Sequence, residues 1–397
     1  MIADLARNGP SSERGWAYAK WAQIELNDRG DPAAAQRHAA LSTGYGGGSD
    51  VNGVISQLNA QIWSGHEEQD LQLSKALEGL VQKRQPDTSE TFFAANKLLA
   101  HGWLLFVSAD YPASGAAWSG LSGAQGTASF DLLSERVAAM SYAMGHDLPD
   151  SRRAMARASD TTPDQLAWQI AQGAFLALPV YWMDAEAGRW ADALAEARAM
   201  DATLEAGKAK RPIYGPMQHV WIWPLEATAL AHLGDVAGAQ AVADRTPLDC
   251  YPCARARAAV AVAAHDAPAA DRWFAEAVRQ GPSLPQAYVE WARARLDRGD
   301  ADGAIALMRQ AEPKAPKMAD IPQAWGEALA AKGDFAGAAA KYAEAQTLAP
   351  SWGRARLKRG AALARLGRRA DADKDLQQAS AMDLTGPERT ELVSIRR

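Results

Sequence analysis

The apolar residues in the last third of the chain follow a helical period that is broken at regular points. They recur at helical spacing from Trp325 to Ala331, a glycine and an aspartate then interrupt the pattern, and it resumes from Phe335 to Ala349. Pro350 ends the segment, because proline has no backbone N–H to donate and disfavours helix in the residue before it. The pattern predicts a helix, a turn, a second helix and a stop.

The same arrangement returns every 34 residues in this part of the chain. Small residues mark two columns, at Ala270, Ala304, Ala338 and Ala372 and at Ala277, Ala311, Ala345 and Ala379. Prolines, turn glycines and large apolar residues keep the same step, at Pro282, Pro316 and Pro350, at Gly299, Gly333 and Gly367, and at Phe274, Met308, Tyr342 and Leu376. Small side chains let antiparallel helices approach closely. A single pair would leave an apolar face uncovered, so we expect at least about three pairs to stack.

These columns resemble the tetratricopeptide repeat (TPR) family, whose unit is a helix–turn–helix with this order of small, aromatic and proline positions. The resemblance covers about residues 251–386, as four units that begin near Tyr251, Pro285, Ala319 and Gly353. It implies an all-α fold, a right-handed α-solenoid of antiparallel helix pairs (a TPR-like superhelix). We expect residues 387–397 to form a C-terminal tail.

The resemblance also implies a function. TPR domains are non-catalytic scaffolds whose first helices line a concave surface that binds a protein or peptide partner. The positions of this chain that match such a surface are Arg255, Val289, Arg293, Gln323, Glu327, Leu357 and Arg365. TPR domains that clamp a C-terminal carboxylate use lysine and asparagine at such places, and this sequence has neither there. This difference counts against a receptor for chaperone tails and leaves the identity of the partner open.

Before residue 251 the pattern persists but loses its register. Turn glycines followed by small residues appear at Gly30, Gly188 and Gly234. We expect a degenerate helical repeat at 1–50, an irregular helical region at 51–170, and degenerate TPR-like helix pairs at 171–250 with a long loop at 205–224. Helical stretches are predicted at 51–64, 68–83, 90–108, 128–144 and 163–180. The sequence contains no run of alternating β-branched residues of the kind that would indicate a β domain.

Composition and charge narrow the class of protein. With 397 residues, 48% hydrophobic and 22% charged, the chain has the composition of a folded protein. A formal charge of -5 makes nucleic acid an unlikely partner. No apolar run approaches the roughly 18 residues of a membrane span, and the N-terminus lacks the pattern of a secretory signal. Two cysteines are too few for a disulfide framework, so we expect a cytoplasmic setting. The oligomeric state stays open.

The signals for catalysis, metals and cofactors are all weak. Cys250 and Cys253 have the spacing of a redox pair, and a proline between them could place Cys253 at a helix start, where a thiol pKa is lowered. A predicted helical array surrounds them, however, which favours a structural pair. The seven histidines have no metal-ligand spacing, and the glycines at 44–48 lack the lysine of a phosphate loop. We therefore expect neither an enzyme nor a cofactor or metal site.

Two tryptophans are candidates for an exposed aromatic anchor. Trp221 and Trp223 lie beside the predicted loop at 205–224, where no repeat column assigns them to the core. Exposed aromatic side chains of this kind often carry binding energy in protein interfaces.

Two other functions stay open at this level. The chain also resembles, more loosely, the TPR halves of bacterial multidomain regulators, which implies a sensor or regulatory role with an effector domain on another chain. The third reading is an enzyme site hidden in the irregular region 50–220. A closed pocket with convergent polar side chains would favour that reading, and a continuous helical surface would count against it.

Overall fold

The computed structural model describes residues 1–45, 51–83, 100–121, 128–158 and 178–396. Within these residues every regular element is a helix, which confirms the all-α fold class. In this part of the chain no helix combines the length and the apolar character needed to cross a bilayer.

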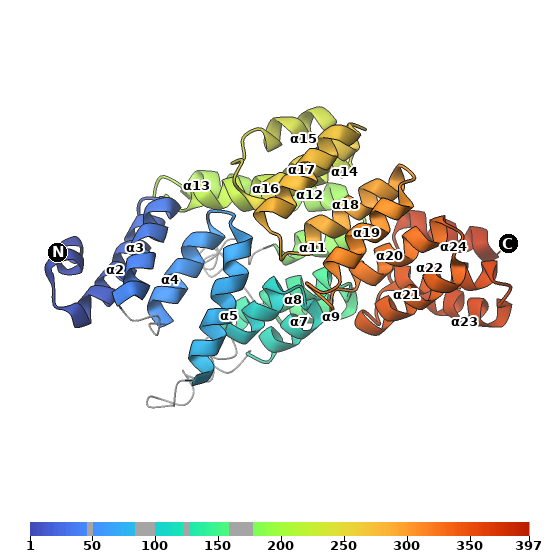
Figure 1. Cartoon of the computed structure of the whole chain (residues 1–397), viewed down its shortest axis with the longest axis horizontal. Coiled ribbons are helices and arrows are strands. Elements are labelled where there is room, and N and C mark those ends of the chain that lie inside the picture. Colours follow the sequence, from blue (N-terminus) through green and yellow to red (C-terminus); the bar gives the residue numbers. More distant parts are fainter. Residues whose placement is uncertain (46–50, 84–99, 122–127, 159–177, 397) are drawn as a thin grey trace.

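The C-terminal array consists of the helix pairs that the repeat predicts. Its elements are α16 (Tyr251–Ala263), α17 (Ala267–Gln280), α18 (Gln286–Asp297), α19 (Ala301–Ala311), α20 (Asp320–Ala331), α21 (Phe335–Leu348), α22 (Gly353–Arg365) and α23 (Arg369–Ser380). Each first helix packs on its own second helix, and each pair packs on the next. The array runs through the orange and red part of the chain (Figure 1).

The repeated residues explain this geometry. The turn glycines Gly299, Gly333 and Gly367 have φ values of 86°, 82° and 76°, a conformation that other residues rarely adopt. Gly299 and Gly333 are each followed by an aspartate that caps the second helix; the Asp334 carboxylate, for example, accepts a 2.9 Å hydrogen bond from the backbone of Gly337. A Cβ atom on Gly326 would lie 2.7 Å from the Tyr342 ring, so this small residue permits the close approach of α20 and α21.

The segment expected to be a C-terminal tail is a helix, α24 (Gly386–Arg396). It packs on α22 and α23 in the place of a further first helix, and buries Leu392 against Leu357 and Leu376. The Glu388 carboxylate accepts a 2.9 Å hydrogen bond from the backbone of Thr385, which helps to start the helix. The expectation of a tail was wrong because the apolar last face of the array requires a cover.

The upstream half also consists of helices joined by short turns. Its described helices are α1 (Ile2–Asn8), α2 (Ser11–Asn27), α3 (Pro32–Tyr45), α4 (Val51–Ile62), α5 (Glu67–Lys83), a helical stretch at 100–107, α7 (Tyr111–Ser119), α8 (Ala128–Met144), α9 (Leu148–Arg157), α11 (Pro179–Glu186), α12 (Trp190–Gly207), α14 (Trp223–His232) and α15 (Val236–Ala243). The turns predicted at Gly30, Gly188 and Gly234 are present, with φ between 63° and 79°. Most of the helices predicted at 90–108 and 163–180 lie outside the described residues.

The loop expected at 205–224 is mostly helical. A short turn follows α12, and the chain is then continuous helix from α13 (Tyr214–Met217) through a π-helical turn, η2 (Gln218–Ile222), into α14. Pro216 and Pro224 suggested a loop because proline cannot donate the helical hydrogen bond. Pro216 lies in a first turn, where that donor is not needed, and the wider turn of η2 directly precedes Pro224.

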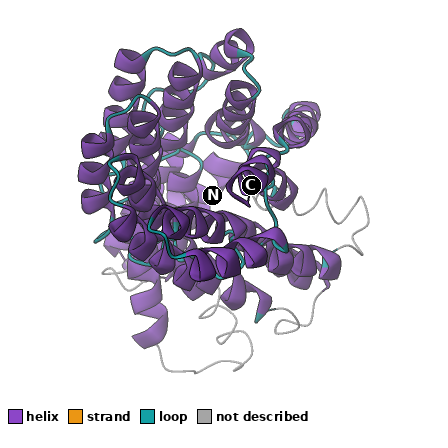
Figure 2. Cartoon of the chain, turned by 90° about the vertical axis from the view of Figure 1, so that its right-hand side faces the viewer, coloured by secondary structure: helices purple, strands orange, loops and turns teal. Residues whose placement is uncertain are grey.

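The two halves of the chain face each other. Figure 1 places α7, α8 and α9 beside α18 to α20, and the view along the long axis shows helices arranged around a common centre (Figure 2). Ala109 and Tyr111 belong to the same buried cluster as Val289 and Ala292. Turns of the upstream half therefore pack onto the first helices of the array.

Candidate functional site

The first helices of the array do not present an open concave face. Val289 is 1% exposed, and Gln323 and Leu357 are completely buried. Val289 packs in the cluster that holds Ala109, from the turn before α7, and Tyr111, the first residue of α7. The prediction that these three residues line a partner-binding surface is therefore wrong, because upstream turns and α24 cover the first helices.

The charged members of that predicted surface are held by neighbouring helices. Arg255 donates hydrogen bonds to Glu290, one of them over 3.1 Å. Arg293 pairs with Asp320 over 2.6 Å, and Glu327 pairs with Arg354 over 2.7 Å. These ion pairs link successive first helices, so the charges serve the packing of the array. Arg365 differs: it is exposed at the end of α22, and its guanidinium lies 4.7 Å from the centre of the Phe335 ring.

One buried charge cluster connects the two halves, and we call it the His146 clamp (His146, Glu186, Arg293, Asp320 and Trp352). His146 lies in the turn between α8 and α9, with its Nδ1 atom 2.9 Å from Glu186 and its Nε2 atom 2.8 Å from Asp320. Its ring stacks on Trp352, with the ring centres 3.5 Å apart. Arg293 holds the second oxygen of Asp320. The clamp thus joins α8, α11, α18 and α20.

The electrostatics of the clamp favour a charged imidazole. Burial lowers the pKa of His146, but Glu186 and Asp320 more than offset that effect and raise the pKa to about 10. Burial raises the pKa of Asp320, but His146 and Arg293 oppose it and hold the pKa well below its usual range. A positive histidine between two carboxylates therefore keeps the upstream turn on the array at neutral pH.

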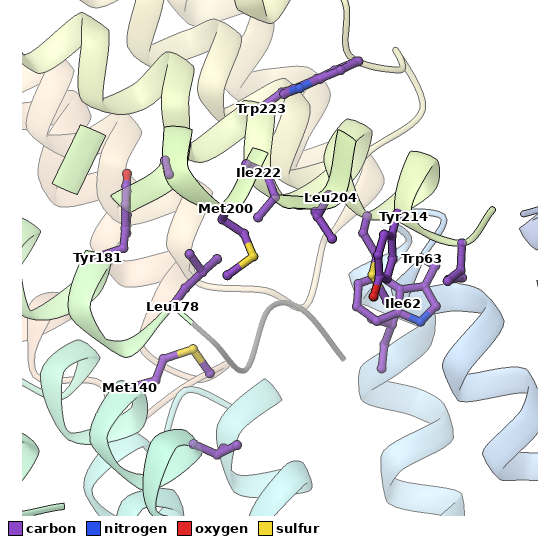
Figure 3. Packing of buried hydrophobic residues seen from close by; sticks show 14 of the residues in the cluster. Ile62, Trp63, Met140, Leu178, Tyr181, Met200, Leu204, Tyr214, Ile222 and Trp223 are labelled. Atoms are coloured by element: carbon purple, nitrogen blue, oxygen red, sulfur yellow. The ribbon is translucent and has the colours of Figure 1, made fainter. Parts of the chain in front are cut away.

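Further along the interface lies a cavity at the centre of the molecule. Its walls are mainly apolar, and they come from both halves of the chain: Trp103, Phe106, Val107, Met140, Met144, Leu178, Trp182, Trp221, Leu225 and Leu284. Its polar lining residues are Glu67, Asp70, Tyr111, Arg255 and Gln286. The cavity has a volume of about 70 Å³. Met140 of α8 and Leu178, just before α11, are seen from close by in Figure 3.

The two carboxylic acids of the cavity lie in the first turn of α5. Asp70 is 2% exposed, and its Oδ1 atom has no hydrogen-bond partner. Burial, with a smaller effect of Glu67, raises the pKa of Asp70 well above its ordinary value. Burial also raises the pKa of Glu67, to about 7, although Arg255 opposes that change. A carboxyl group that is buried without a partner is costly to ionise, and its free oxygen can accept a hydrogen bond from a ligand.

A hydrogen bond between the halves borders the same cavity. The Gln286 side chain donates to the Tyr111 hydroxyl over 2.9 Å. Nearby, the backbone of Ser283 donates to Glu68 over 2.9 Å. These contacts fix α5 and α7 against the start of α18, so the cavity is bordered by elements that lie far apart in the sequence.

The two tryptophans expected to be exposed are placed differently. Trp223, which is labelled in Figure 3, is 7% exposed, and its indole N–H donates to Asp201 over 2.8 Å. The guanidinium of Arg245 lies 3.7 Å from the centre of the Trp223 ring. The expectation of an exposed anchor is therefore wrong for Trp223, because it starts a packed helix. Trp221 is partly buried, donates to the backbone of Ile62 over 3.1 Å, and lines the cavity.

Cys250 and Cys253 form a disulfide at the start of α16, and both are completely inaccessible to solvent. A Cβ atom on Gly65 would lie 2.7 Å from the Cys250 sulfur, so the bond packs directly against the turn between α4 and α5. The sequence did not predict this bond. In the described part of the chain, no three His, Cys, Asp or Glu side chains are grouped as metal ligands.

Sequence reasoning missed Glu67, Asp70 and His146. A usable signal was present for the acids, because Glu67, Asp70, Ser74, Leu77 and Val81 follow one face of the predicted helix at 68–83 and its continuation. Acidic residues on an otherwise apolar face indicate a buried charge. His146 had no comparable signal, since its partners Glu186 and Asp320 are far away in the sequence.

The chain was compared with family models, curated proteins and solved structures. No family model matches the sequence, and no curated protein matches it. Among solved structures, the chain is similar to yeast Tom70, with 12% identity, coverage of 97% of this chain and 95% of that one, and a TM-score of 0.46.

Two further structures give similar results. A tetratricopeptide repeat protein from Parabacteroides merdae ATCC 43184 has 14% identity, coverage of 66% and 98%, and a TM-score of 0.42. YrrB, a TPR protein with an unusual peptide-binding site, has 16% identity, coverage of 47% and 95%, and a TM-score of 0.34. Such likenesses concern the fold alone. The 34-residue columns of this chain and its stacked helix pairs make the fold TPR-like.

Proposed function

We propose that the protein is a non-catalytic scaffold that binds a protein or peptide partner, and that a side chain of this partner enters the central cavity. The observation that carries the proposal is the cavity itself, with aromatic and aliphatic walls and a few convergent polar groups. Binding sites in proteins commonly have this composition. The stacked helices would supply a rigid frame for the docking of the partner.

The cavity replaces the groove as the expected contact. Val289, Gln323 and Leu357 cannot reach a partner while the upstream turns and α24 cover them. Trp182 and Leu225, in contrast, line the cavity and are only partly buried. We therefore expect a partner to approach from the side of α11 and α14.

Photocrosslinking tests this proposal. The photoreactive residue p-benzoylphenylalanine is placed at Trp182, with Leu248, which is 66% exposed and outside the cavity lining, as the matched control position. We expect one defined partner from native cell extract to crosslink from position 182 and not from position 248. Adding Leu225→Trp, which fills the cavity while keeping it apolar, should remove that adduct. Equal adducts from both positions, or an adduct that survives the filling substitution, would refute the proposal.

The same cavity also favours the alternative of a hidden enzyme site. The raised pKa of Glu67, about 7, is suited to general acid or base catalysis at neutral pH. The described lining contains no serine, cysteine, lysine or histidine, so Glu67 and Asp70 would be the groups that carry such chemistry. If Glu67→Gln abolishes turnover of a substrate while crosslinking of the partner from position 182 is unchanged, the hypothesis of an enzyme replaces that of a scaffold.

A further inference from the structure

We propose that the central cavity binds a primary alkylammonium group, with the carboxylates of Asp70 and Glu67 as its anionic partners and the aromatic walls around its stem. The inference rests on the proposed scaffold function where the ammonium group belongs to a lysine of the partner. The same chemistry is also carried by a free amine, and the experiment below separates the two sources.

The charge balance of the cavity favours a cation. Arg255 is the positive group of the lining, and its guanidinium is already held by hydrogen bonds to Glu290 from both Nε and Nη2. These two charges cancel, which leaves the acids of α5 facing the cavity. Burial raises the pKa of the phenol of Tyr111, so this residue carries no charge near neutral pH. The phenols of Tyr181 and Tyr251 nearby have pKa values raised by burial as well.

Asp70 supplies the unsatisfied acceptor. It is 2% exposed, it lines the cavity, and its Oδ1 atom lacks a hydrogen-bond partner. Leaving a buried acceptor without a donor costs roughly 1–3 kcal/mol, and more when the group is charged. An ammonium group has three N–H donors and a positive charge, so it would satisfy the acceptor and neutralise the carboxylate together.

The walls and the size of the cavity agree with this ligand. Trp103, Phe106, Trp182 and Trp221 supply ring surfaces that attract a cation and pack against methylene groups. A volume of about 70 Å³ admits an ammonium group with its first methylenes but no folded segment. A carboxylate or phosphate group would instead be repelled by Asp70 and Glu67 wherever these groups are ionised, and would gain no ion pair from them.

Proton release gives the binding a characteristic pH dependence. With the cavity empty, burial raises the pKa of Asp70 well above its ordinary value and that of Glu67 to about 7, so both groups hold a proton more readily than exposed carboxyl groups do. A bound cation favours the ionised carboxylates, so the protons leave when the ligand binds. Affinity should therefore increase from pH 6 to pH 8, a range in which an alkylammonium group stays charged because its own pKa is near 10.

Isothermal titration calorimetry of the full chain with n-butylammonium tests the inference, with n-butanol as a neutral probe of the same length. We expect butylammonium to bind at least tenfold more tightly than butanol, and at least threefold more tightly at pH 8 than at pH 6. Asp70→Asn should weaken butylammonium binding at least tenfold. Asp302→Asn, at a surface carboxylate whose side chain is 81% exposed, should leave it unchanged. Asparagine resembles the protonated acid, so Asp70→Asn should keep the fold, which circular dichroism checks.

Two probes distinguish the source of the ammonium group. If Nα-acetyl-lysine methylamide binds at least as tightly as butylammonium, the ligand is the lysine of a partner, and if only butylammonium binds, it is a free amine. Binding of butylammonium that is no tighter than butanol, or that is unchanged in Asp70→Asn, would overturn the inference. If the inference fails in this way but a partner still crosslinks from position 182, the proposed scaffold function remains supported.

Discussion

The His146 clamp makes a quantitative prediction about stability. We consider His146→Gln, which keeps a polar side chain in the turn but removes the charge between Glu186 and Asp320. The pKa of His146 is raised from 6.5 to about 10 in the folded chain. At about 1.4 kcal/mol for each pH unit between the two values, the charged imidazole contributes about 4–5 kcal/mol to the free energy of unfolding. His146 is only 9% exposed, so solvent screens this interaction little.

The sign of the pH dependence follows from the raised pKa. The contribution is fully present below the unfolded pKa, about 6.5, and is lost as the pH rises through the folded pKa, about 10. The destabilisation caused by His146→Gln should therefore be about 4 kcal/mol at pH 6.5 and about 1 kcal/mol at pH 9.5. On the acid side the opposite holds for Asp320, whose lowered pKa contributes stability that disappears when the pH falls below the ordinary aspartate range.

The effect is measured as the difference in the free energy of unfolding between wild type and variant. Both are unfolded in urea at several pH values from 6.5 to 9.5, and circular dichroism and tryptophan fluorescence follow the unfolding. Lysine and tyrosine titrate in both proteins, so their contributions cancel. His265→Gln is the matched control, because His265 also has a positive φ, 56° against 63° at His146, and lies exposed in the turn between α16 and α17. A His146→Gln destabilisation that does not change with pH would refute a charged imidazole in the clamp.

Three other predictions concern packing and access. Gly326→Ala should destabilise the array by about 1–3 kcal/mol in thermal unfolding, because its Cβ meets the Tyr342 ring. Gly79→Ala is the control: open space surrounds the new atom, so it should be neutral or stabilise α5 by up to about 1 kcal/mol. A loss of stability at both sites would contradict this account of the packing. Arg293→Glu should lower the free energy of unfolding by at least about 1–3 kcal/mol, because it puts a second carboxylate beside Asp320; an unchanged urea midpoint would place Arg293 outside the clamp. The disulfide should resist reduction by dithiothreitol in the native protein and yield two free thiols in urea, since Cys250 and Cys253 are inaccessible to solvent. Thiol titration measures this, and rapid reduction of the folded protein would show that α16 opens readily.

The sequence predicts the pairing of helices in the C-terminal half well, because that pairing depends on neighbours in the repeat. Gly326 faces Tyr342 of the same unit, and Gly360 faces Leu376 of its own unit. Each contact joins residues 16 positions apart, so a fixed period is enough to reveal it. In 205–224 the prolines misled the prediction, since Pro224 follows a π-helical turn that ordinary helical spacing does not describe.

The covering of the first helices was not predictable from the same columns. Val289 has the position of a groove residue in its unit, and nothing in that unit shows that Tyr111 belongs to the same buried cluster. The two residues lie 178 positions apart in the sequence, and no repeat period connects them. The cavity and its acids are hidden for the same reason, because Asp70 and Arg255 meet only when the upstream half closes on the array.

Backbone strain indicates which upstream turns are committed to that closure. Most helix pairs turn at a glycine, but Ala109 and His146 turn with positive φ, 59° and 63°, although they carry a side chain. For a residue with a Cβ atom this conformation costs roughly 1–2 kcal/mol, which a favourable contact can offset. Ala109 is completely buried in the cluster of Val289, and His146 lies between two carboxylates. The two strained upstream turns at Ala109 and His146 thus both touch the array.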